Sequence, residues 1–239
     1  DIISCMNVKI LFLDLDGTVL DSNENVSDEN ITAIKRARDA GVVTVISTGR
    51  AQFDSQYVID AVEPDYFSGL NGALVRDMRT DEIIFQRVLD IDVAKQVTHL
   101  MESLDMYYMV CTHNGTYCLQ QTLDALRAGG LEFSEGYMAR FGQYLKPIES
   151  LELTKPAKFF TLAKDDETAA EFQRRLSGIK GIFAAPTLGN GFDVLPAEQH
   201  KAVSAKMLCE KLGIDAKDAA AIGDSENDLE LMEYVAHSV

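Results

Sequence analysis

The chain of 239 residues lacks the features that mark several special classes of protein. No apolar run approaches the roughly 18 residues that a membrane span needs, and the run at residues 10–13 ends at Asp14. The first residues show no basic patch followed by an apolar stretch, so no signal peptide is predicted. There is no internal repeat or low-complexity tract, and a composition of 46% hydrophobic and 25% charged residues excludes disorder.

Basic residues are scarce. The sequence has 22 Lys and Arg against 38 Asp and Glu, a net charge of −16. Nucleic acids and anionic membranes both need a basic face, so neither is expected as a partner. Binding of a small anionic molecule depends on the charge of its site and not on the net charge of the protein, so such a ligand is not excluded. The oligomeric state does not follow from these features.

Cysteine and histidine motifs are also missing. No CxxC pair occurs, and no histidine stands at zinc-finger spacing. The pattern predicts reduced thiols in a cytoplasmic protein and argues against a metal site built on histidine. The residues concerned are Cys5, Cys111, Cys118, Cys209, His99, His113, His200 and His237.

The first part of the sequence predicts alternating strands and helices. Ser27 is typical of a helix N-cap, and Gly41 is typical of the residue just beyond a helix end. The predicted elements are a strand at 8–13, a helix from Ser27 to Gly41, a strand at 42–46, a helix ending at Val62 and a strand at 66–70. This order predicts a parallel sheet with right-handed crossovers.

The pattern then changes. Between about residues 80 and 190, strands come in adjacent pairs with helices at 93–104 and 167–176. This pattern predicts an antiparallel sheet with helices on one face, an α+β arrangement. Alternation resumes with a helix at 201–212, a strand at 219–222 and a helix at 226–235. We therefore expect an α/β core domain of residues 1–79 and 191–239 with an inserted second domain of residues 80–190.

Three polar loops each follow a predicted parallel strand. They are Asp14-Leu15-Asp16-Gly17-Thr18, Ser47-Thr48-Gly49-Arg50 and Gly223-Asp224-Ser225-Glu226-Asn227-Asp228. Open α/β sheets bind ligands at the carboxyl ends of their strands, near a point where the strand order reverses. If the strand at 8–13 lies between those at 42–46 and 219–222, Asp14 is at the centre of such a site.

The acids of these loops predict a cation site. Asp14, Asp16, Asp224 and Asp228 would converge, and carboxylates so close together need a compensating cation. Hard oxygen ligands suit Mg²⁺, which also takes phosphate oxygens. A carboxylate can attack phosphorus to form an acyl phosphate, and a second carboxyl two residues later can protonate the leaving oxygen and then activate water.

Groups that would bind a phosphate are present as well. Thr48 offers a hydroxyl, Gly49 a closely approachable backbone N–H, and Lys201 a positive charge at a helix start. Phosphoryl transfer depends on positioning and on neutralising the phosphoryl oxygens. Together these residues predict a metal-assisted phosphoryl-transfer site.

These motifs resemble the haloacid dehalogenase (HAD) superfamily, and within it the Cof-type phosphatases with a large α/β cap of type IIB. The matching segments are DLDGT at 14–18, TGR at 48–50, Asn71-Gly72-Ala73, Lys201 and GDSEND at 223–228. The resemblance implies a Rossmann-like parallel-sheet core with an inserted α+β cap.

The resemblance also implies roles for individual residues. Asp14 would be the nucleophile and Asp16 the general acid and base. Mg²⁺ would be held by the Asp14 carboxylate, the Asp16 backbone carbonyl and Asp224, with Asn227 and Asp228 in support. The expected phosphate and substrate binders are Thr48, Gly49, Arg50, Asn71, Gly72, Lys201 and Asn227.

The sequence departs from the family pattern in three places. Ala202 follows the lysine where the family usually has glycine. Met6 would be a natural start, so residues 1–5 are expected to be foreign to the natural chain. The family continues into a further strand and helix where this chain stops, at His237-Ser238-Val239, so we expect a truncated C-terminus.

The predicted function is Mg²⁺-dependent hydrolysis of a small phosphorylated metabolite such as a sugar phosphate. A phosphomutase or phosphotransferase would use the same aspartyl phosphate, and the sequence does not separate the two. A phospho-accepting signalling module is a third possibility. The second acid at Asp16 and the long insertion between Thr48 and Lys201 oppose it.

Overall fold

A computed structural model describes residues 8–113, 115–128, 138, 141–148, 151, 156–187 and 189–239. The chain divides into two compact units. Unit 1 consists of Asp1–Gln86 and Gln199–Val239, and unit 2 consists of Arg87–Glu198. Residues 1–5 and Met6, expected to include foreign sequence, lie outside the described part of the chain.

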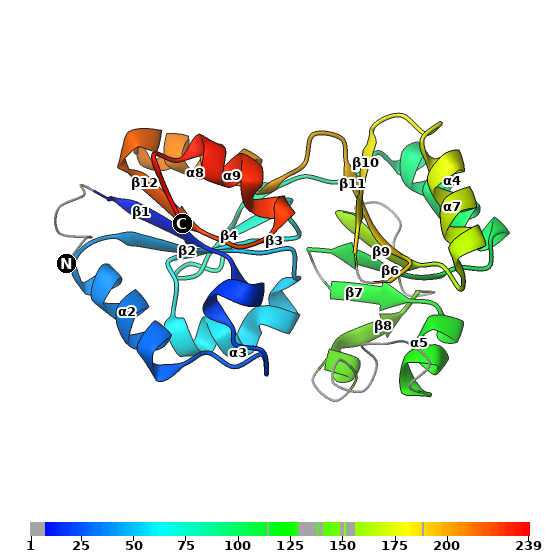
Figure 1. The fold of residues 1–239 in the computed structure, drawn as a ribbon, viewed down its shortest axis with the longest axis horizontal. Helices are drawn as coiled ribbons and strands as arrows, with labels where there is room; N and C mark the ends of the chain where they lie inside the picture. Colours follow the sequence, from blue (N-terminus) through cyan, green and yellow to red (C-terminus); the bar gives the residue numbers. More distant parts are fainter. Residues whose placement is uncertain are drawn as a thin grey trace. The chain divides into compact units, whose positions relative to one another are not determined.

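Unit 1 is built on a seven-stranded sheet in the order β13-β12-β1-β2-β3-β4-β5 (Figure 1). The strands are β1 (Ile10–Leu13), β2 (Val43–Ser47), β3 (Tyr66–Gly69), β4 (Leu74–Asp77), β5 (Ile83–Gln86), β12 (Ala219–Ile222) and β13 (His237–Ser238). Pairing is parallel from β13 to β3, while β3, β4 and β5 pair antiparallel. The predicted parallel sheet is confirmed, and β1 lies between β2 and β12.

Helices cover both faces of this sheet (Figure 1). They are α2 (Asp28–Asp39), α3 (Gln52–Val62), α8 (Lys201–Leu212) and α9 (Leu229–Tyr234), with shorter turns η1 (Leu15–Val19), η4 (Ala216–Asp218) and η5 (Glu226–Asp228). Phe12 of β1 packs with Leu208 of α8, whereas its neighbour Leu13 packs with Ile34 of α2 and Val58 of α3. Successive strand residues point to opposite faces, so β1 is buried on both sides.

Local sequence sets the helix ends. The Ser27 hydroxyl accepts a hydrogen bond from the Asn30 backbone N–H at 3.1 Å, as expected of an N-cap. Gly41, two residues after α2, has φ +87°. The helix predicted at 226–235 is instead split into η5 and α9. A capping box begins η5, in which the side chains of Ser225 and Asp228 each form a hydrogen bond with the other residue's backbone.

Unit 2 contains a six-stranded sheet in the order β10-β11-β9-β6-β7-β8. Its strands are β6 (Tyr107–Thr112), β7 (Gly115–Cys118), β8 (Leu145–Pro147), β9 (Lys158–Leu162), β10 (Ile182–Pro186) and β11 (Gly191–Pro196). Every neighbouring pair is antiparallel except β7 and β8, which are parallel. The predicted antiparallel character is therefore confirmed for four of the five pairs.

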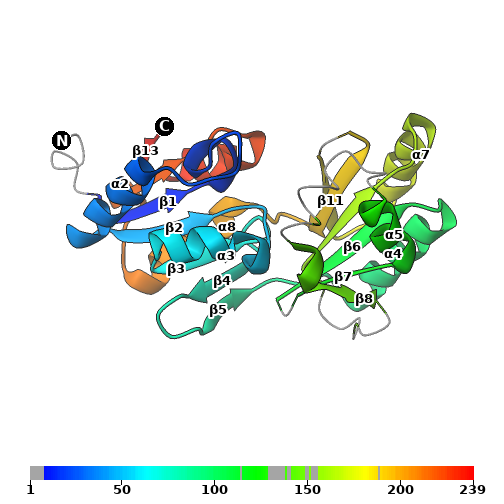
Figure 2. The same cartoon turned by 90° about the horizontal axis from the view of Figure 1, so that it is seen from below.

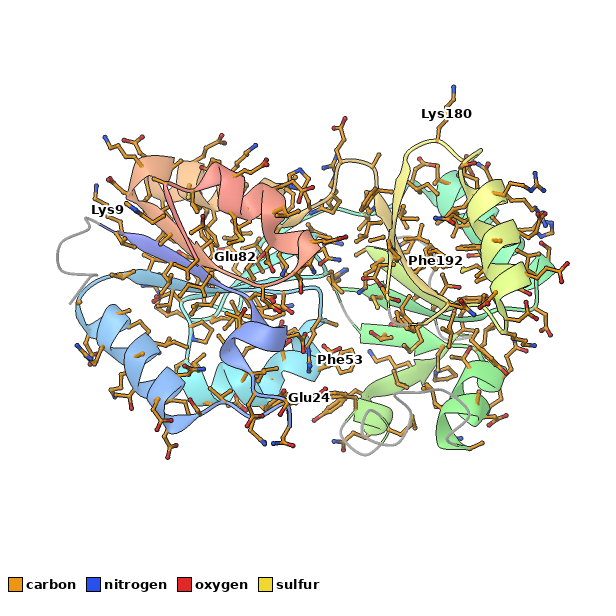
Figure 3. All side chains as sticks on the ribbon, viewed as in Figure 1. Lys9, Glu24, Phe53, Glu82, Lys180 and Phe192 are labelled. Carbon is orange, nitrogen blue, oxygen red and sulfur yellow. The ribbon has the colours of Figure 1, made fainter. Side chains whose placement is uncertain are left out.

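Helices pack on both faces of the second sheet, so the expectation of helices on one face is wrong. The helical elements are α4 (Ile91–Ser103), α5 (Gln120–Arg127), α7 (Asp166–Leu176) and the short turn η2 (Gly142–Tyr144). Phe159 of β9 packs in a core with Phe172 of α7, while the next residue, Phe160, packs with Leu126 of α5. Phe192 of β11, labelled in Figure 3, lies 5.5 Å from the Phe172 ring.

The division between the units differs from the predicted boundaries at 79/80 and 190/191. Strand β5 pairs with β4 and completes a hairpin at the edge of the first sheet (Figure 2), so unit 1 runs to Gln86. Strand β11 pairs with β9 and β10, so unit 2 runs to Glu198. Hydrogen-bond partners, which the composition of a strand does not reveal, decide where each strand belongs.

Candidate active site

The loop after β1 places Asp14 at the carboxyl edge of the first sheet. The Asp14 backbone N–H donates to the Ile222 carbonyl at 3.0 Å, which fixes this loop to the end of β12. Asp14 is buried, with 4% of the residue exposed. The chain then turns through η1, where Gly17 has φ +77°. Asp14 therefore stands at the point where the strand order reverses.

Lys201 lies between two carboxylates. Its Nζ donates to Asp14 Oδ1 at 2.6 Å and to Asp228 Oδ1 at 2.7 Å, and the lysine is fully buried. Burial raises the pKa of Asp14 to about 6, because Lys201 offsets the loss of hydration only in part and Asp228 adds repulsion. One lysine lies between two buried carboxylates, so the group has a net negative charge when both acids are ionised. A further cation would balance that charge.

Three acids converge at this point. Ligand atoms of Asp14, Asp224 and Asp228 all lie within 4.8 Å of one another. The Thr18 hydroxyl donates to Asp224 Oδ1 at 3.1 Å. All the donors are hard oxygens, the set that Mg²⁺ prefers, so these residues fit a divalent cation.

Glycine makes room for this cluster. A Cβ on Gly17 would lie 2.2 Å from Asp224 Oδ2, and its positive φ disfavours any side chain. A Cβ on Gly223 would lie 2.5 Å from Asp228 Cγ. The glycines of the two motifs are thus needed for the close approach of the acids.

Asp16 is not part of this cluster, so the expectation that its carboxylate converges with those of Asp14, Asp224 and Asp228 is wrong. Its side chain is 57% exposed and forms a two-point pair with Arg50, whose Nε lies 2.9 Å from Asp16 Oδ2. Arg50 also lies 3.4 Å from Glu24, which is labelled in Figure 3. Burial disfavours the charge on Arg50, but the bonds to Asp16 outweigh it, so the pKa of the guanidinium lies above its ordinary value. Arg50, expected to bind substrate, is held here by two carboxylates.

Thr48, Asn71 and Asn227 connect the three loops. Thr48 is fully buried, and its hydroxyl accepts the Arg50 backbone N–H at 3.2 Å. The Asn71 backbone N–H donates to the Thr48 carbonyl at 3.0 Å, and Asn227 Nδ2 donates to Asn71 Oδ1 at 3.3 Å. The predicted binders at the ends of β2, β3 and β12 are therefore joined by hydrogen bonds.

Gly49 and Gly72 stand where larger residues would collide. A Cβ on Gly49 would lie 2.9 Å from Asn71 Oδ1, and a Cβ on Gly72 would lie 2.7 Å from Ser204 Oγ. Ser204 in turn lies 2.8 Å from Ser68 Oγ. These two serines hold α8 against the end of β3.

Two features were not predicted from the sequence. The first is the Ser68–Ser204 contact. The second is Gln199, whose side-chain amide donates to the Asn71 carbonyl at 2.9 Å. The only sequence signal for Gln199 is its place two residues before Lys201.

Comparisons with known proteins show the family of this chain. The family model of haloacid dehalogenase-like hydrolases matches residues 11–239. The 5-amino-6-(5-phospho-D-ribitylamino)uracil phosphatase YwtE of Bacillus subtilis is 28% identical, over 97% of this chain and 87% of the relative. The chain therefore belongs to the haloacid dehalogenase-like hydrolase family, and it is an enzyme of the phosphatase class.

Solved structures share the two-sheet fold. A haloacid dehalogenase-like hydrolase from B. subtilis is 25% identical, with a TM-score of 0.81 over 97% of this chain and 88% of that chain. A sugar phosphatase of HAD subclass IIB is 18% identical, with a TM-score of 0.77 over 97% and 86%. The predicted resemblance to the HAD superfamily is confirmed by the family model, and the subclass IIB structure shares the fold of this chain. No helix in the described part of the chain is long and apolar enough to cross a membrane.

Proposed function

We propose that this enzyme is a Mg²⁺-dependent phosphomonoesterase that acts through an aspartyl phosphate on Asp14. The observation that carries the proposal is the arrangement of Lys201 between Asp14 and Asp228, with Asp224 close by. It combines a buried carboxylate, a fixed cation and a set of oxygen ligands in one place.

Asp14 acts as the nucleophile. One carboxylate oxygen attacks phosphorus, and the bond between phosphorus and the ester oxygen breaks, which leaves an acyl phosphate on Asp14 and releases an alcohol. Water then attacks the phosphorus of the acyl phosphate, and the bond to Asp14 breaks to give inorganic phosphate. Burial of Asp14 suits this role because a poorly hydrated carboxylate is easier to bring to phosphorus.

Asp16 moves the protons. It gives a proton to the leaving alcohol oxygen in the first step and takes one from water in the second. In this structure its carboxylate is paired with Arg50, so it exchanges that contact for the leaving oxygen when substrate binds. Its exposed side chain permits such a change.

The phosphoryl oxygens are held by the other residues of the site. Lys201 Nζ, the Thr48 hydroxyl and the Asn227 amide supply positive charge or hydrogen-bond donors around Asp14. The Asp14 and Asp224 carboxylates, the Asp16 carbonyl and the supporting Asp228 would hold Mg²⁺. When bound, this ion neutralises charge on the transferring phosphoryl group.

We also propose that unit 2 is the cap and selects the organic part of the substrate. The substrates expected are small phosphorylated metabolites with sugar or sugar-alcohol groups, as in the named relative that acts on a phosphoribitylaminouracil. Both named enzymes compared are phosphatases, which favours hydrolysis over phosphoryl transfer to a sugar. The proposed location is the cytoplasm, based on the cysteine spacing.

Phosphate release from p-nitrophenyl phosphate tests the reaction. We expect turnover with Mg²⁺, loss of turnover with EDTA, and loss of turnover in Asp14→Asn with Mg²⁺ present. Equal turnover in all three cases would exclude the proposal. A panel of phosphorylated sugars and ribitylaminouracil phosphate then identifies the substrate class, and conversion of a hexose 1-phosphate to its 6-isomer would instead indicate a mutase.

A further inference from the structure

Gln199 occupies a junction in the chain. It is the first residue of unit 1 after unit 2 and stands two residues before Lys201. Its side chain is buried, with only 2% of the residue exposed. Side-chain Nε2 donates to the Asn71 carbonyl at 2.9 Å and approaches the His200 carbonyl at 3.4 Å.

Both neighbours of this nitrogen are acceptors, which fixes the orientation of the amide. Only the NH₂ end of glutamine can donate, so exchanging nitrogen and oxygen would set the oxygen against two carbonyls. The Oε1 atom is then buried with no hydrogen-bond partner among the described residues. Most buried polar atoms in proteins are paired, so the amide keeps its bond to Asn71 at the cost of an unpaired oxygen.

A hydrogen bond to the Asn71 carbonyl restrains more than one loop, because Asn71 is itself bonded to the loops that carry Thr48 and Asn227. Its backbone N–H donates to Thr48, and its Oδ1 accepts from Asn227. Its φ of +53° lies in the left-handed region, which non-glycine residues seldom adopt without support. The loops of Asn71, Thr48 and Asn227 are thus connected. The hydrogen bond from Gln199 connects them to a fourth segment, which leads directly into Lys201.

We infer that Gln199 is a positioning residue for phosphoryl transfer. Its amide ties the Asn71 loop to the start of α8, so Thr48 and Asn227 keep a fixed arrangement relative to Lys201. Gln199 itself touches no reacting atom. This role rests on the proposed phosphatase function, since the residues that it aligns are the proposed phosphate binders.

Two substitutions of Gln199 distinguish a positioning role of its side chain from a role in packing alone. Gln199→Met keeps the length of the side chain and removes the donor. We expect kcat to fall about tenfold to a hundredfold with little change in KM, because small displacements of catalytic groups slow the chemical step. Urea unfolding of each variant shows that it is folded under the assay conditions.

Gln199→Glu tests the same role through the pH dependence of kcat, which a packing role would not change. A protonated carboxyl can donate one O–H to the Asn71 carbonyl, whereas an ionised one has no donor and faces two carbonyl oxygens. The kcat of Gln199→Glu relative to wild type should therefore rise as pH falls. The same ratio for Gln199→Met should stay constant with pH.

Hydrogen exchange at the Asn71 backbone amide tests the inference without any assay of activity. That amide donates to Thr48, and we expect it to exchange at least about tenfold faster in Gln199→Met. Gln121→Met is the control for loss of a glutamine donor, because Gln121 also donates to a backbone carbonyl, that of Met106 in unit 2. It should leave kcat and Asn71 exchange unchanged.

The outcomes are distinguishable. Faster exchange in Gln199→Met together with an inactive wild type would support the positioning of the loop and reject the proposed function. An active wild type with Asn71 exchange unchanged in Gln199→Met, or with a Gln199→Glu to wild-type ratio that does not vary with pH, would overturn the inference.

Discussion

Lys201 Nζ lies 2.6 Å from Asp14 Oδ1, and both side chains are buried. The lysine comes from the first residue of α8, and the aspartate comes from the end of β1, 187 residues earlier in the chain. This contact joins the two sequence-distant parts of unit 1 at the proposed site. Removing either partner therefore affects both stability and activity.

Replacing Lys201 by Met leaves Asp14 and Asp228 buried without their cation. We expect the free energy of unfolding in EDTA to fall by about 3–5 kcal/mol, as for other broken buried ion pairs. Addition of Mg²⁺ should restore part of this loss, because a cation again faces the acids. Urea unfolding with and without Mg²⁺ measures both effects. Lys211→Met, at an exposed position in the last turn of α8, is the control. Equal loss in both variants would contradict the account.

Asp14→Asn should show a stability change that depends on pH. The pKa of Asp14 in the folded protein, about 6, lies above its ordinary value of 3.8, so the folded state binds the proton more tightly than the unfolded state. Wild type therefore loses stability as pH rises between these values, and asparagine does not.

The measurement is urea unfolding in EDTA at about pH 5 and about pH 7.5. We expect the stability of Asp14→Asn minus that of wild type to increase with pH by on the order of 1 kcal/mol over this range. A difference that stays constant or decreases with pH would show that burial does not raise the pKa of Asp14.

Asp224→Asn tests the cation site. Mg²⁺ that binds only the folded protein raises its Tm in proportion to the logarithm of the ion concentration above Kd. We expect the Mg²⁺ concentration needed to produce a given rise in Tm to increase at least tenfold in Asp224→Asn, since one charged ligand is lost. Asp215→Asn removes an exposed acid paired with Lys217 and should leave the Mg²⁺ response unchanged. The same response in both variants would refute a cation site at Asp224.

A second buried ion pair, in unit 2, is expected to be important for stability. Lys158 Nζ lies 2.8 Å from Asp193 Oδ2, and both side chains are about 90% buried. Lys158→Met alone should lower the free energy of unfolding by about 3–5 kcal/mol, because it leaves a buried carboxylate without its cation. The double variant Lys158→Met with Asp193→Leu should recover most of that loss. Additive losses in the double variant would show that the pair is not coupled.

The sequence predicts the core of unit 1 well. The apolar runs before Asp14 and after Gly41 are short and bounded by polar residues, so they could be assigned to β1 and β2. The convergence of Asp14, Asp224 and Asp228 followed from their places after parallel strands, because such strand ends meet at one edge of a sheet.

Other features depend on pairing that a single sequence does not show. The predicted boundaries separate β5 from unit 1 and β11 from unit 2, whereas hydrogen-bond partners place β5 in the first sheet and β11 in the second. The two-point contact of Arg50 with Asp16 and the amide of Gln199 on Asn71 are also tertiary contacts. Nothing in the residue types near either position predicts them.

The most direct test of the central claim is to trap the phosphoryl group on Asp14. In Asp16→Asn, p-nitrophenol still leaves without a proton donor, but the acyl phosphate lacks the base that activates water. The variant is mixed with Mg²⁺ and radiolabelled p-nitrophenyl phosphate, quenched in acid and digested. The account predicts label on the peptide that contains Asp14, released by hydroxylamine as expected of an acyl phosphate. An active wild-type enzyme with no label on that peptide in Asp16→Asn, or with full turnover retained in Asp14→Asn, would contradict it.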